Sequence, residues 1–197
     1  MLEKTEKRIL HGIEDAIENA QSINAETLFS YSFQFQTTDL LPLLTHPADK
    51  NKTRIYWEQP YSKLSFAAIG NIKEFNINKF RLTVDEINKF FNQSVSVPKS
   101  PIVFPRIIGG ISFNKEKSKH DAVWSRFAKN RFIISECLGT MTEDGAWLTI
   151  STLINPKESK KQIYTRFKKL CDYYKNRLPI ILKPLKPIKI KEYKNTP

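Results

Sequence analysis

The spacing of hydrophobic side chains changes along the chain, and each spacing predicts one kind of element. Between Leu10 and Ala20, apolar residues recur every three or four positions among charged ones, which predicts an amphipathic helix over residues 3–20. In the stretch LFSYSFQFQ, residues 28–36, aromatic side chains instead occupy every second position, with Ser or Gln between them. This alternation is typical of a strand with one buried face. We therefore expect the first helix to lie on a sheet.

Residues 54–70, RIYWEQPYSKLSFAAIG, predict a β-hairpin. Two apolar runs, Ile55–Trp57 and Leu64–Ile69, flank a polar pair and a segment that contains proline. Further on, Thr83 and Glu86 have the spacing of a capping box, which predicts the start of a short helix. The first half of the chain is thus expected to contain antiparallel strands and helices.

The second half continues in the same manner. The run PIVFPRIIGGISFN, residues 101–114, predicts a strand with a bulge or sharp bend, because Pro105 and the pair Gly109 and Gly110 interrupt its β-branched residues. We interpret this diglycine as structural, since no Lys-Ser/Thr pair and no helix start follow it that would bind a phosphate. Periodicity predicts four more elements: a helix around Trp124 and Phe127, a strand from Phe132 to Cys137, a β-rich run over GAWLTISTLI, and a long helix opening at Asn155-Pro156 with the apolar stripe Ile163, Phe167, Leu170 and Tyr174.

The positive charge is concentrated near the end of the chain. The net charge is +12, but residues 156–197 hold 13 Lys and Arg against three acids, so the preceding residues are almost neutral. We interpret this segment as a solvated helix face followed by a linker. The Pro- and Lys-rich residues 178–197 lack donors for a full strand ladder, which divides the chain into an α/β portion, 1–177, and an edge strand and linker, 178–197. A small basic protein that binds nucleic acid or another anion through residues 156–197 is the alternative.

Hydropathy and cysteine content indicate a location. No apolar run approaches the roughly 18 residues of a transmembrane helix, and the first twenty residues mix acids and bases, so we expect a cytoplasmic protein without a membrane partner. Cys137 and Cys171 lack metal-ligand spacing and are interpreted as reduced structural thiols.

The residues alone predict no catalytic group and no metal ligand. Three histidines lack a Cys, Asp or Glu at ligand spacing, and the pair His120-Asp121 predicts a helix cap. Three serines lack a nucleophile-elbow context, and four carboxylates near apolar strands are interpreted as members of salt bridges or turns, although burial there could raise a pKa. These residues are His11, His46 and His120; Ser125, Ser135 and Ser151; and Glu58, Glu136, Glu143 and Asp144.

Four motifs, taken in order, resemble the amino-terminal half of isochorismate synthases, members of the chorismate-utilising enzyme family. They are RIYWEQP with LSFAAIG, then FPRIIGGISFN, then Trp124 with Phe127, then RFIISECL. The resemblance runs from about Thr27 to the Pro-rich end of the chain. The positions characteristic of the family, interpreted as structural, are Trp57, Glu58, Gly70, Gly109, Gly110, Phe113 and Trp124.

The resemblance implies a fold and an activity. It implies an α/β chain of the α+β type, the amino-terminal part of the layered chorismate-utilising enzyme fold, with a mostly antiparallel sheet and flanking helices. The full-length enzymes convert chorismate to isochorismate with Mg²⁺. Their lysine base, glutamate acid and metal-binding glutamates all belong to the carboxy-terminal half, so none maps onto these residues. In the hairpin, Tyr56, Trp57, Phe66 and Ile69 would be buried, Glu58 would bond a partner within the fold, and Gly70 would permit a tight exit.

We therefore interpret the chain as the amino-terminal portion of an isochorismate synthase that serves menaquinone or phylloquinone synthesis, or a salicylate or siderophore pathway. Alone, it is expected to be inactive and to bind no Mg²⁺. Its expected partners are chorismate, in the full-length enzyme, and a carboxy-terminal half, in the same chain or separately encoded. A regulatory subunit that pairs with a separate chorismate-binding chain is a further alternative, and a nucleic-acid partner is the less favoured one.

Overall fold

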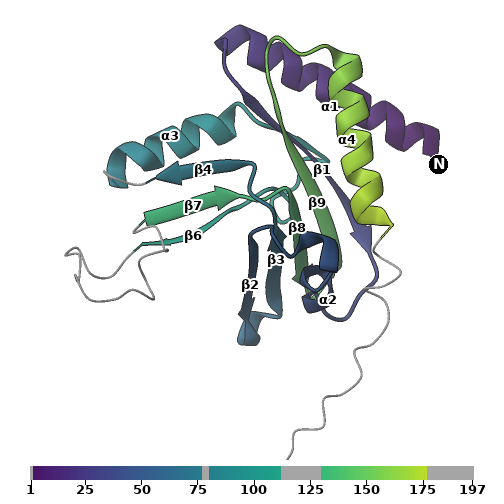
Figure 1. Ribbon diagram of the computed structural model, residues 1–197, viewed down its shortest axis with the longest axis vertical. Helices are drawn as coiled ribbons and strands as arrows, with labels where there is room; N and C mark the ends of the chain where they lie inside the picture. The colour runs from purple at the N-terminus through teal and green to yellow at the C-terminus, as the bar shows by residue number, and fades with distance from the viewer. Residues whose placement is uncertain (1, 77–79, 112–129, 177–197) are drawn as a thin grey trace, which may run out of the picture.

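The computed structural model describes residues 2–76, 80–111 and 130–176 (Figure 1). Its helices are α1 (Leu2–Ile23), α2 (Leu41–Leu44), α3 (Phe80–Asn92) and α4 (Lys160–Lys175), with 3₁₀ turns at Pro47–Asp49 and Pro60–Ser62. Its strands are β1 (Thr27–Phe35), β2 (Arg54–Gln59), β3 (Leu64–Ile69), β4 (Lys73–Asn76), β5 (Val95–Val97), β6 (Ile107–Ile111), β7 (Asn130–Ile134), β8 (Cys137–Thr142) and β9 (Gly145–Ile154).

The strands form two sheets. The larger sheet has six strands in the order β2-β3-β8-β9-β1-β5, and the smaller one has three in the order β4-β7-β6. Every pair is antiparallel except β1 with β5, which is parallel. Helices flank the larger sheet (Figure 1). The predicted fold class, a mixed α/β chain with a mostly antiparallel sheet and flanking helices, is confirmed.

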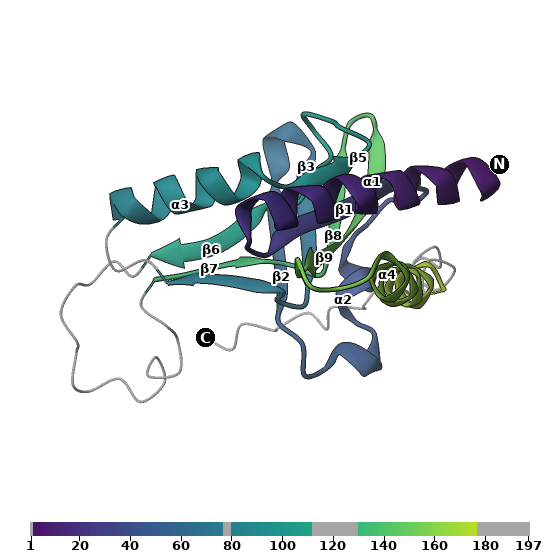
Figure 2. The same cartoon turned by 90° about the horizontal axis from the view of Figure 1, so that it is seen from above.

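Helices α1, α2 and α4 cover one face of the six-stranded sheet. Ile13 of α1 and Phe167 of α4 are fully buried in the main core, where the Phe167 ring meets Phe29 of β1 edge-on at 4.9 Å between centroids. A hydrogen bond from Tyr164 to Glu6 joins α4 to α1, which lie side by side in Figures 1 and 2. The amphipathic first helix therefore lies on the sheet as predicted.

The opposite face of the six-stranded sheet packs against the three-stranded sheet and α3. A second core joins Leu28 of β1 to Phe75 of β4 and Ile134 of β7, with Ile87 of α3 partly buried against them. This arrangement overturns the prediction that β1 has only one buried face, because residues 27 to 32 are all buried.

The polar side chains on the second face of β1 are satisfied across the sheet. The Ser32 hydroxyl lies 2.8 Å from that of Thr149 on β9, and Ser30 donates to Ser96 of β5 at 2.9 Å. Hydroxyl pairs between neighbouring strands allow small polar residues to be buried at modest cost. The alternation of aromatic and polar residues therefore marks two buried faces with different chemistry.

The predicted hairpin is confirmed, but the expected burial of Trp57 is wrong. Strands β2 and β3 pair from Arg54 with Ile69 to Gln59 with Leu64. Phe66 and Ile69 are buried and Tyr56 is partly buried, but Trp57 keeps 45% of its surface exposed and stacks on Phe66. Because β2 is the edge strand, Trp57 has strand neighbours on one side only.

Three other boundaries differ from the predictions. Helix α3 already runs at Phe80, so Thr83 lies inside the helix and not at its start. Strand β6 begins after Pro105 and pairs with β7 in an unbroken register, so no bulge interrupts Ile107–Ile111. The predicted strand 132–137 is two strands, β7 and β8, because the chain changes sheets at Ser135 and Glu136.

Gly109 has the structural role predicted for the diglycine. A Cβ atom added at this position would lie 2.0 Å from the carbonyl oxygen of Arg131 on β7. Only glycine permits such a close approach of two backbones. Several predictions made above concern residues outside the described ranges and stay predictions. They are those for Phe113, His120-Asp121, Trp124, Ser125, Phe127 and the segment 178–197.

Helix α4 begins four residues later than Pro156, at a complete capping box. The Ser159 hydroxyl accepts from the backbone of Gln162, and the Gln162 side chain accepts from the backbone of Ser159. The predicted stripe is confirmed at Ile163, Phe167 and Tyr174, which are buried, while Leu170 is partly buried.

Replacing Ser159 by alanine is expected to lower the free energy of unfolding by about 1 kcal/mol, because a helix cap is lost at an exposed site. Urea titration followed by circular dichroism measures the change. Ser159→Asn, which restores a capping oxygen, should recover most of it, whereas an unchanged midpoint for Ser159→Ala would contradict the assigned cap.

Candidate functional site

The candidate site forms where the chain passes between the two sheets. It leaves the larger sheet after β3 through Gly70 and returns to it after β7 through Glu136. Gly70 has φ +78°, and a Cβ atom there would lie 2.8 Å from the Cβ of Glu136, so the two crossings touch. The tight exit predicted for Gly70 is confirmed, and it places the Glu136 side chain beside the segment before β2.

Glu136 is the centre of a polar cluster. Its Oε1 atom lies 2.5 Å from Nζ of Lys52 and accepts a hydrogen bond of 2.6 Å from the hydroxyl of Tyr174. Lys52 also lies 3.6 Å from Oδ1 of Asp49, which accepts from Tyr173 at 3.0 Å. We call Asp49, Lys52, Glu136, Tyr173 and Tyr174 the Lys52 cluster; it joins two loops to helix α4.

The Lys52 cluster changes the acidity of its members. Burial acts to lower the pKa of Lys52, but the hydrogen bond and charge of Glu136, aided by Tyr173 and Asp49, outweigh it and raise the pKa. Burial, with nearby Cys137 and Glu136, raises the pKa of Tyr174 far above its usual value. Lys52 therefore stays protonated and Tyr174 neutral at ordinary pH, so neither is poised to exchange protons near neutrality.

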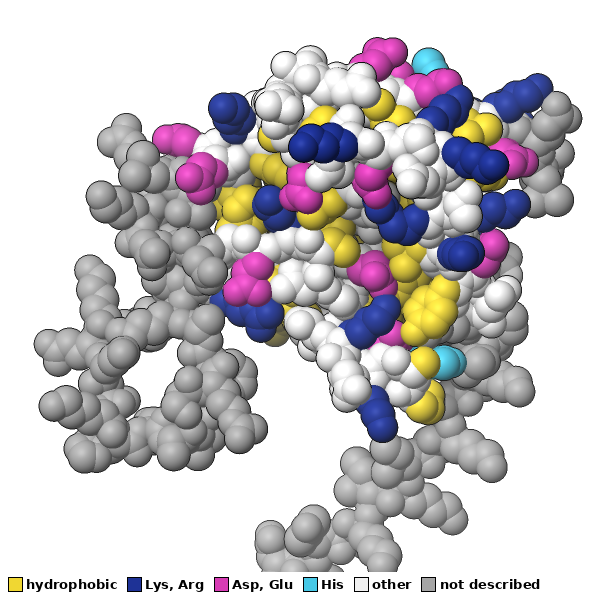
Figure 3. All heavy atoms as spheres, turned by 45° about the horizontal axis from the view of Figure 1, so that its top comes forward, with side chains coloured by type: hydrophobic (Ala, Val, Ile, Leu, Met, Phe, Trp, Pro, Cys, Tyr) yellow, Lys and Arg dark blue, Asp and Glu magenta, His cyan; other side chains and the backbone are white. Residues whose placement is uncertain are grey.

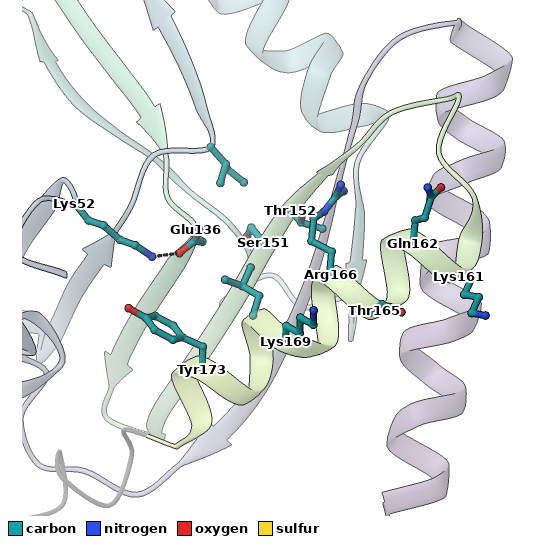
Figure 4. A pocket seen from close by; sticks show the side chains of 12 residues that line it. Lys52, Glu136, Ser151, Thr152, Lys161, Gln162, Thr165, Arg166, Lys169 and Tyr173 are labelled. Carbon is teal, nitrogen blue, oxygen red and sulfur yellow. Dashed lines mark hydrogen bonds and ion pairs between the residues drawn. The ribbon is translucent and has the colours of Figure 1, made fainter. Parts of the chain in front are cut away.

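A groove of about 890 Å³ runs from the Lys52 cluster along α4 (Figure 4). Strand β9 supplies hydroxyl groups and α4 supplies positive charges, and the two elements face each other across the groove in Figure 4. The lining residues are Lys52, Ile72, Glu136, Ser151, Thr152, Lys161, Gln162, Thr165, Arg166, Lys169, Leu170 and Tyr173.

Two of the four basic side chains that line the groove are already compensated. Arg166 pairs with Glu158 and donates to the carbonyl of Leu153 at 2.7 Å, just as Lys52 pairs with Glu136. Among the described residues, Lys161 and Lys169 form no ion pair, and both are exposed to solvent. Exposed lysines attract anions only weakly and non-specifically.

The face of the molecule drawn in Figure 3 does not carry charge of one sign. On the face drawn in Figure 3, acidic and basic side chains are interspersed over the helices and strands. Within the described parts of the chain, no three His, Cys, Asp or Glu side chains lie together in a way that could hold a metal ion. None of the helices described there combines the length and hydropathy needed to cross a membrane.

The carboxylates considered from the sequence make structural contacts. Glu136 and Glu143 form salt bridges, with Lys52 and with Lys63, and Asp144 lies in the turn between β8 and β9. Glu58 accepts a hydrogen bond of 3.0 Å from Tyr56, its expected partner within the fold. The interpretation as members of salt bridges or turns is therefore confirmed for Glu136, Glu143 and Asp144, whereas Glu58 forms a hydrogen bond within β2.

The remaining candidates also have structural places. His46 caps a 3₁₀ turn by accepting from the backbone of Ala48 at 3.2 Å, and His11 is exposed on α1. Cys137 and Cys171 are both buried thiols, as predicted, and burial raises the pKa of Cys171 to about 12. A thiol with such a pKa is a poor nucleophile at neutral pH.

Sequence reasoning missed four of the five residues of the Lys52 cluster. Lys52 and Glu136 are separated by 84 positions and Tyr174 lies 38 positions further on, so no local motif joins them. The only local signal was Asp49 with Lys52, three residues apart beside Pro47, which has the spacing of a helical-turn ion pair.

These elements and contacts belong to a known family. The family model described as "Chorismate binding enzyme" matches residues 15–195, which is most of the chain. The chain is therefore a member of the chorismate-binding enzyme family. The match includes α4 and most of the basic segment, so the alternative of a small basic nucleic-acid-binding or anion-binding protein is not supported.

Within that family, the chain is similar to isochorismate synthases. It is 24% identical over 168 residues to isochorismate synthase MenF of Bacillus subtilis (strain 168), a match that covers 80% of this chain and 35% of that protein. A solved structure of MenF, the menaquinone-specific isochorismate synthase from Escherichia coli, matches 90% of this chain and 35% of that one, with a TM-score of 0.45 and 15% identity. The chain spans about a third of the length of the curated relative.

Proposed function

We propose that this chain is the amino-terminal portion of an isochorismate synthase and that it acts as part of a longer assembly. The observation that carries the proposal is the family match over residues 15–195, together with a curated relative named isochorismate synthase. The chain covers 35% of that relative, which leaves room for a catalytic part beyond it. The six-stranded sheet with its helices is then a scaffold for the reaction.

The chemistry of the described residues supports a scaffolding role. Conversion of chorismate to isochorismate needs a base that activates water and an acid that assists the departing hydroxyl. The Lys52 cluster offers neither, because the raised pKa values of Lys52 and Tyr174 leave no deprotonated form to act as a base and make both groups weak proton donors near neutral pH. The acid and base of the proposed reaction would come from the further segment.

The resemblance also implies Mg²⁺, and the described residues do not fit it. Mg²⁺ prefers oxygen ligands in octahedral geometry, commonly one or two carboxylates plus substrate and water. Asp49 and Glu136, the carboxylates that approach each other through Lys52, are occupied by that lysine and by tyrosine hydroxyls. We propose that any Mg²⁺ is held by the further segment.

The pathway and location are parts of the same proposal. The relative from Escherichia coli is named menaquinone-specific, which favours menaquinone synthesis over phylloquinone, salicylate or siderophore pathways. Two buried thiols are in keeping with a reducing compartment and favour the cytoplasm.

The test compares two proteins: residues 1–197 alone, and a protein whose reading frame is extended past Pro197. With chorismate and Mg²⁺, the extended protein is expected to form isochorismate, and residues 1–197 are expected to form none. Chromatography of the products measures both. Isochorismate formed by residues 1–197 alone would contradict the proposal that the catalytic groups lie in a further segment. A folded extended protein that leaves chorismate unchanged would contradict the proposed reaction.

A matched control removes a characteristic side chain without touching the groove. Glu58 is exposed and bonds only Tyr56 among the described residues, so Glu58→Gln in the extended protein should keep normal turnover. A large loss of turnover at unchanged stability would assign Glu58 a part in the chemistry.

A further inference from the structure

A second cavity lies away from the groove, between the hairpin and the three-stranded sheet. It has a volume of about 490 Å³, within the range of roughly 300–1,000 Å³ that is usual for small-molecule pockets. Its walls come from β2 and β3, from α3, from β6 and β7, and from the segment before β6. The lining residues are Trp57, Phe66, Ile87, Phe91, Phe104, Pro105, Arg106, Ile107, Ile108, Gly109 and Phe132. We call this cavity the aromatic pocket.

Arg106 is the only charged residue among the described residues that line the aromatic pocket. Its guanidinium lies 4.3 Å from the ring centroid of Phe104 and 4.8 Å from that of Phe66. Two aromatic rings therefore fix the plane of the guanidinium by cation–π contact. The group is held in place before any ligand arrives.

The charge of Arg106 is not neutralised within the described parts of the chain. One terminal nitrogen, Nη2, donates to the carbonyl of Ile102 at 3.1 Å, while the buried Nε has no hydrogen-bond partner there. No carboxylate there lies within ion-pair distance of it. Burial without a counter-charge lowers the pKa of Arg106, which shows that the surroundings disfavour an isolated cation.

An anion in the pocket would remove this penalty. A carboxylate can take two parallel hydrogen bonds from a guanidinium, and such charge-assisted bonds are the strong ones. Trp57, Phe91 and Phe132 offer apolar or aromatic surface to the remainder of the ligand. The lining residues therefore match a ligand with an apolar ring and one negative charge.

We propose that the aromatic pocket binds a small aromatic monocarboxylate, with its carboxylate on Arg106 and its ring against the aromatic walls. The site is separate from the groove and does not depend on the proposed synthase activity. A small molecule is favoured over a protein segment because the cavity is of ligand size and offers one fixed charge, whereas a docking strand would need a row of partners.

Trp57 provides a signal from the pocket itself. It lines the pocket with 45% of its surface exposed, so a ring that enters should change its fluorescence. Trp147, on β9, does not line the pocket, and Trp124 lies outside the described residues, so Trp57→Phe identifies the share of the signal that comes from the pocket.

The test is a titration of the 197-residue protein with 1-naphthoate and with the uncharged 1-naphthamide, by calorimetry and by fluorescence. One naphthoate is expected to bind per chain, at least about tenfold (about 1.4 kcal/mol) more tightly than the amide, since only the carboxylate forms a hydrogen-bonded charge pair with Arg106. Absence of naphthoate binding, or equal binding of the two compounds, would overturn the proposal.

Variants locate the binding. Arg106→Met, which keeps an apolar side chain, should weaken naphthoate binding about tenfold or more and leave the amide unaffected, and Arg106→Lys should fall between. Arg54→Met is the matched control, because Arg54 lies on β2 and donates to Leu44 outside the pocket. Circular dichroism shows whether each variant is folded. Equal affinity in folded Arg106→Met, or binding lost when a longer protein covers the pocket, would assign the cavity to packing and not to a ligand.

Discussion

Replacing Phe167 by alanine is expected to lower the free energy of unfolding by about 3–5 kcal/mol, the range for removal of a fully buried aromatic ring. Phe167 has no exposed surface and meets Phe29 edge-on at 4.9 Å, so its ring fixes α4 on the sheet. A loss of this size is a large part of the roughly 5–15 kcal/mol that stabilises an ordinary domain. Denaturant titration at constant m-value measures it.

Two neighbouring substitutions serve as controls for Phe167. Phe167→Leu retains most of the apolar volume and should cost less than half as much, and Lys168→Ala alters an exposed position on the same turn and should stay within about 0.5 kcal/mol. If Phe167→Ala cost no more than Lys168→Ala, the packing of α4 on β1 would be wrong.

Replacing Lys52 by methionine is expected to lower the free energy of unfolding by about 2–3 kcal/mol, because Asp49 and Glu136 would lose the cation between them. The loss should be smaller than the roughly 3–5 kcal/mol of a fully buried pair, since the side chains of Lys52 and Glu136 keep 31% and 23% of their surface exposed. Lys63→Met is the matched control: its partner Glu143 lies 3.4 Å away, but both side chains are largely exposed, so less than about 1 kcal/mol is expected. Thermal and denaturant unfolding of the three proteins gives the comparison.

The pH dependence of this difference has a definite sign. The folded-state pKa of Lys52 is raised, so its contribution to stability is fully present below the unfolded value of about 10.4 and is lost as pH rises through the higher folded value. The groups that face Lys52 are Asp49, Glu136, Tyr173 and Tyr174. The stability gap between wild type and Lys52→Met should therefore be constant from pH 7 to pH 9. A gap that closes by pH 8 would mean that the lysine is not held by these carboxylates.

A helix or strand could be predicted from the sequence where the spacing of its own hydrophobic residues determines its burial. The helix expected over residues 3–20 is α1, Leu2–Ile23, and the run GAWLTISTLI is β9. Periodicity succeeded there because each segment buries the side chains that its own spacing selects. It failed at residues 132–137, since apolar residues resume at Cys137 directly after Ser135 and Glu136, where the chain changes sheets.

The candidate site could not be predicted in the same way. Whether Trp57 is covered depends on which strand forms the edge of the sheet, and that order is a tertiary property. The partners of Glu136 come from a loop before β2 and from the end of α4. Such contacts between distant segments leave no period in the sequence, whereas the resemblance to isochorismate synthases, built on ordered motifs, was sufficient to find the family.

The contact between the crossings at Gly70 and Glu136 has a consequence for how the two sheets are joined. These crossings are the two shortest covalent links between the sheets, and they meet at one point. Glu136 lies at that point and pairs with Lys52 at 2.5 Å, so a single ion pair connects the loop before β2 to both links. A change at Glu136 therefore bears on both sheets at once.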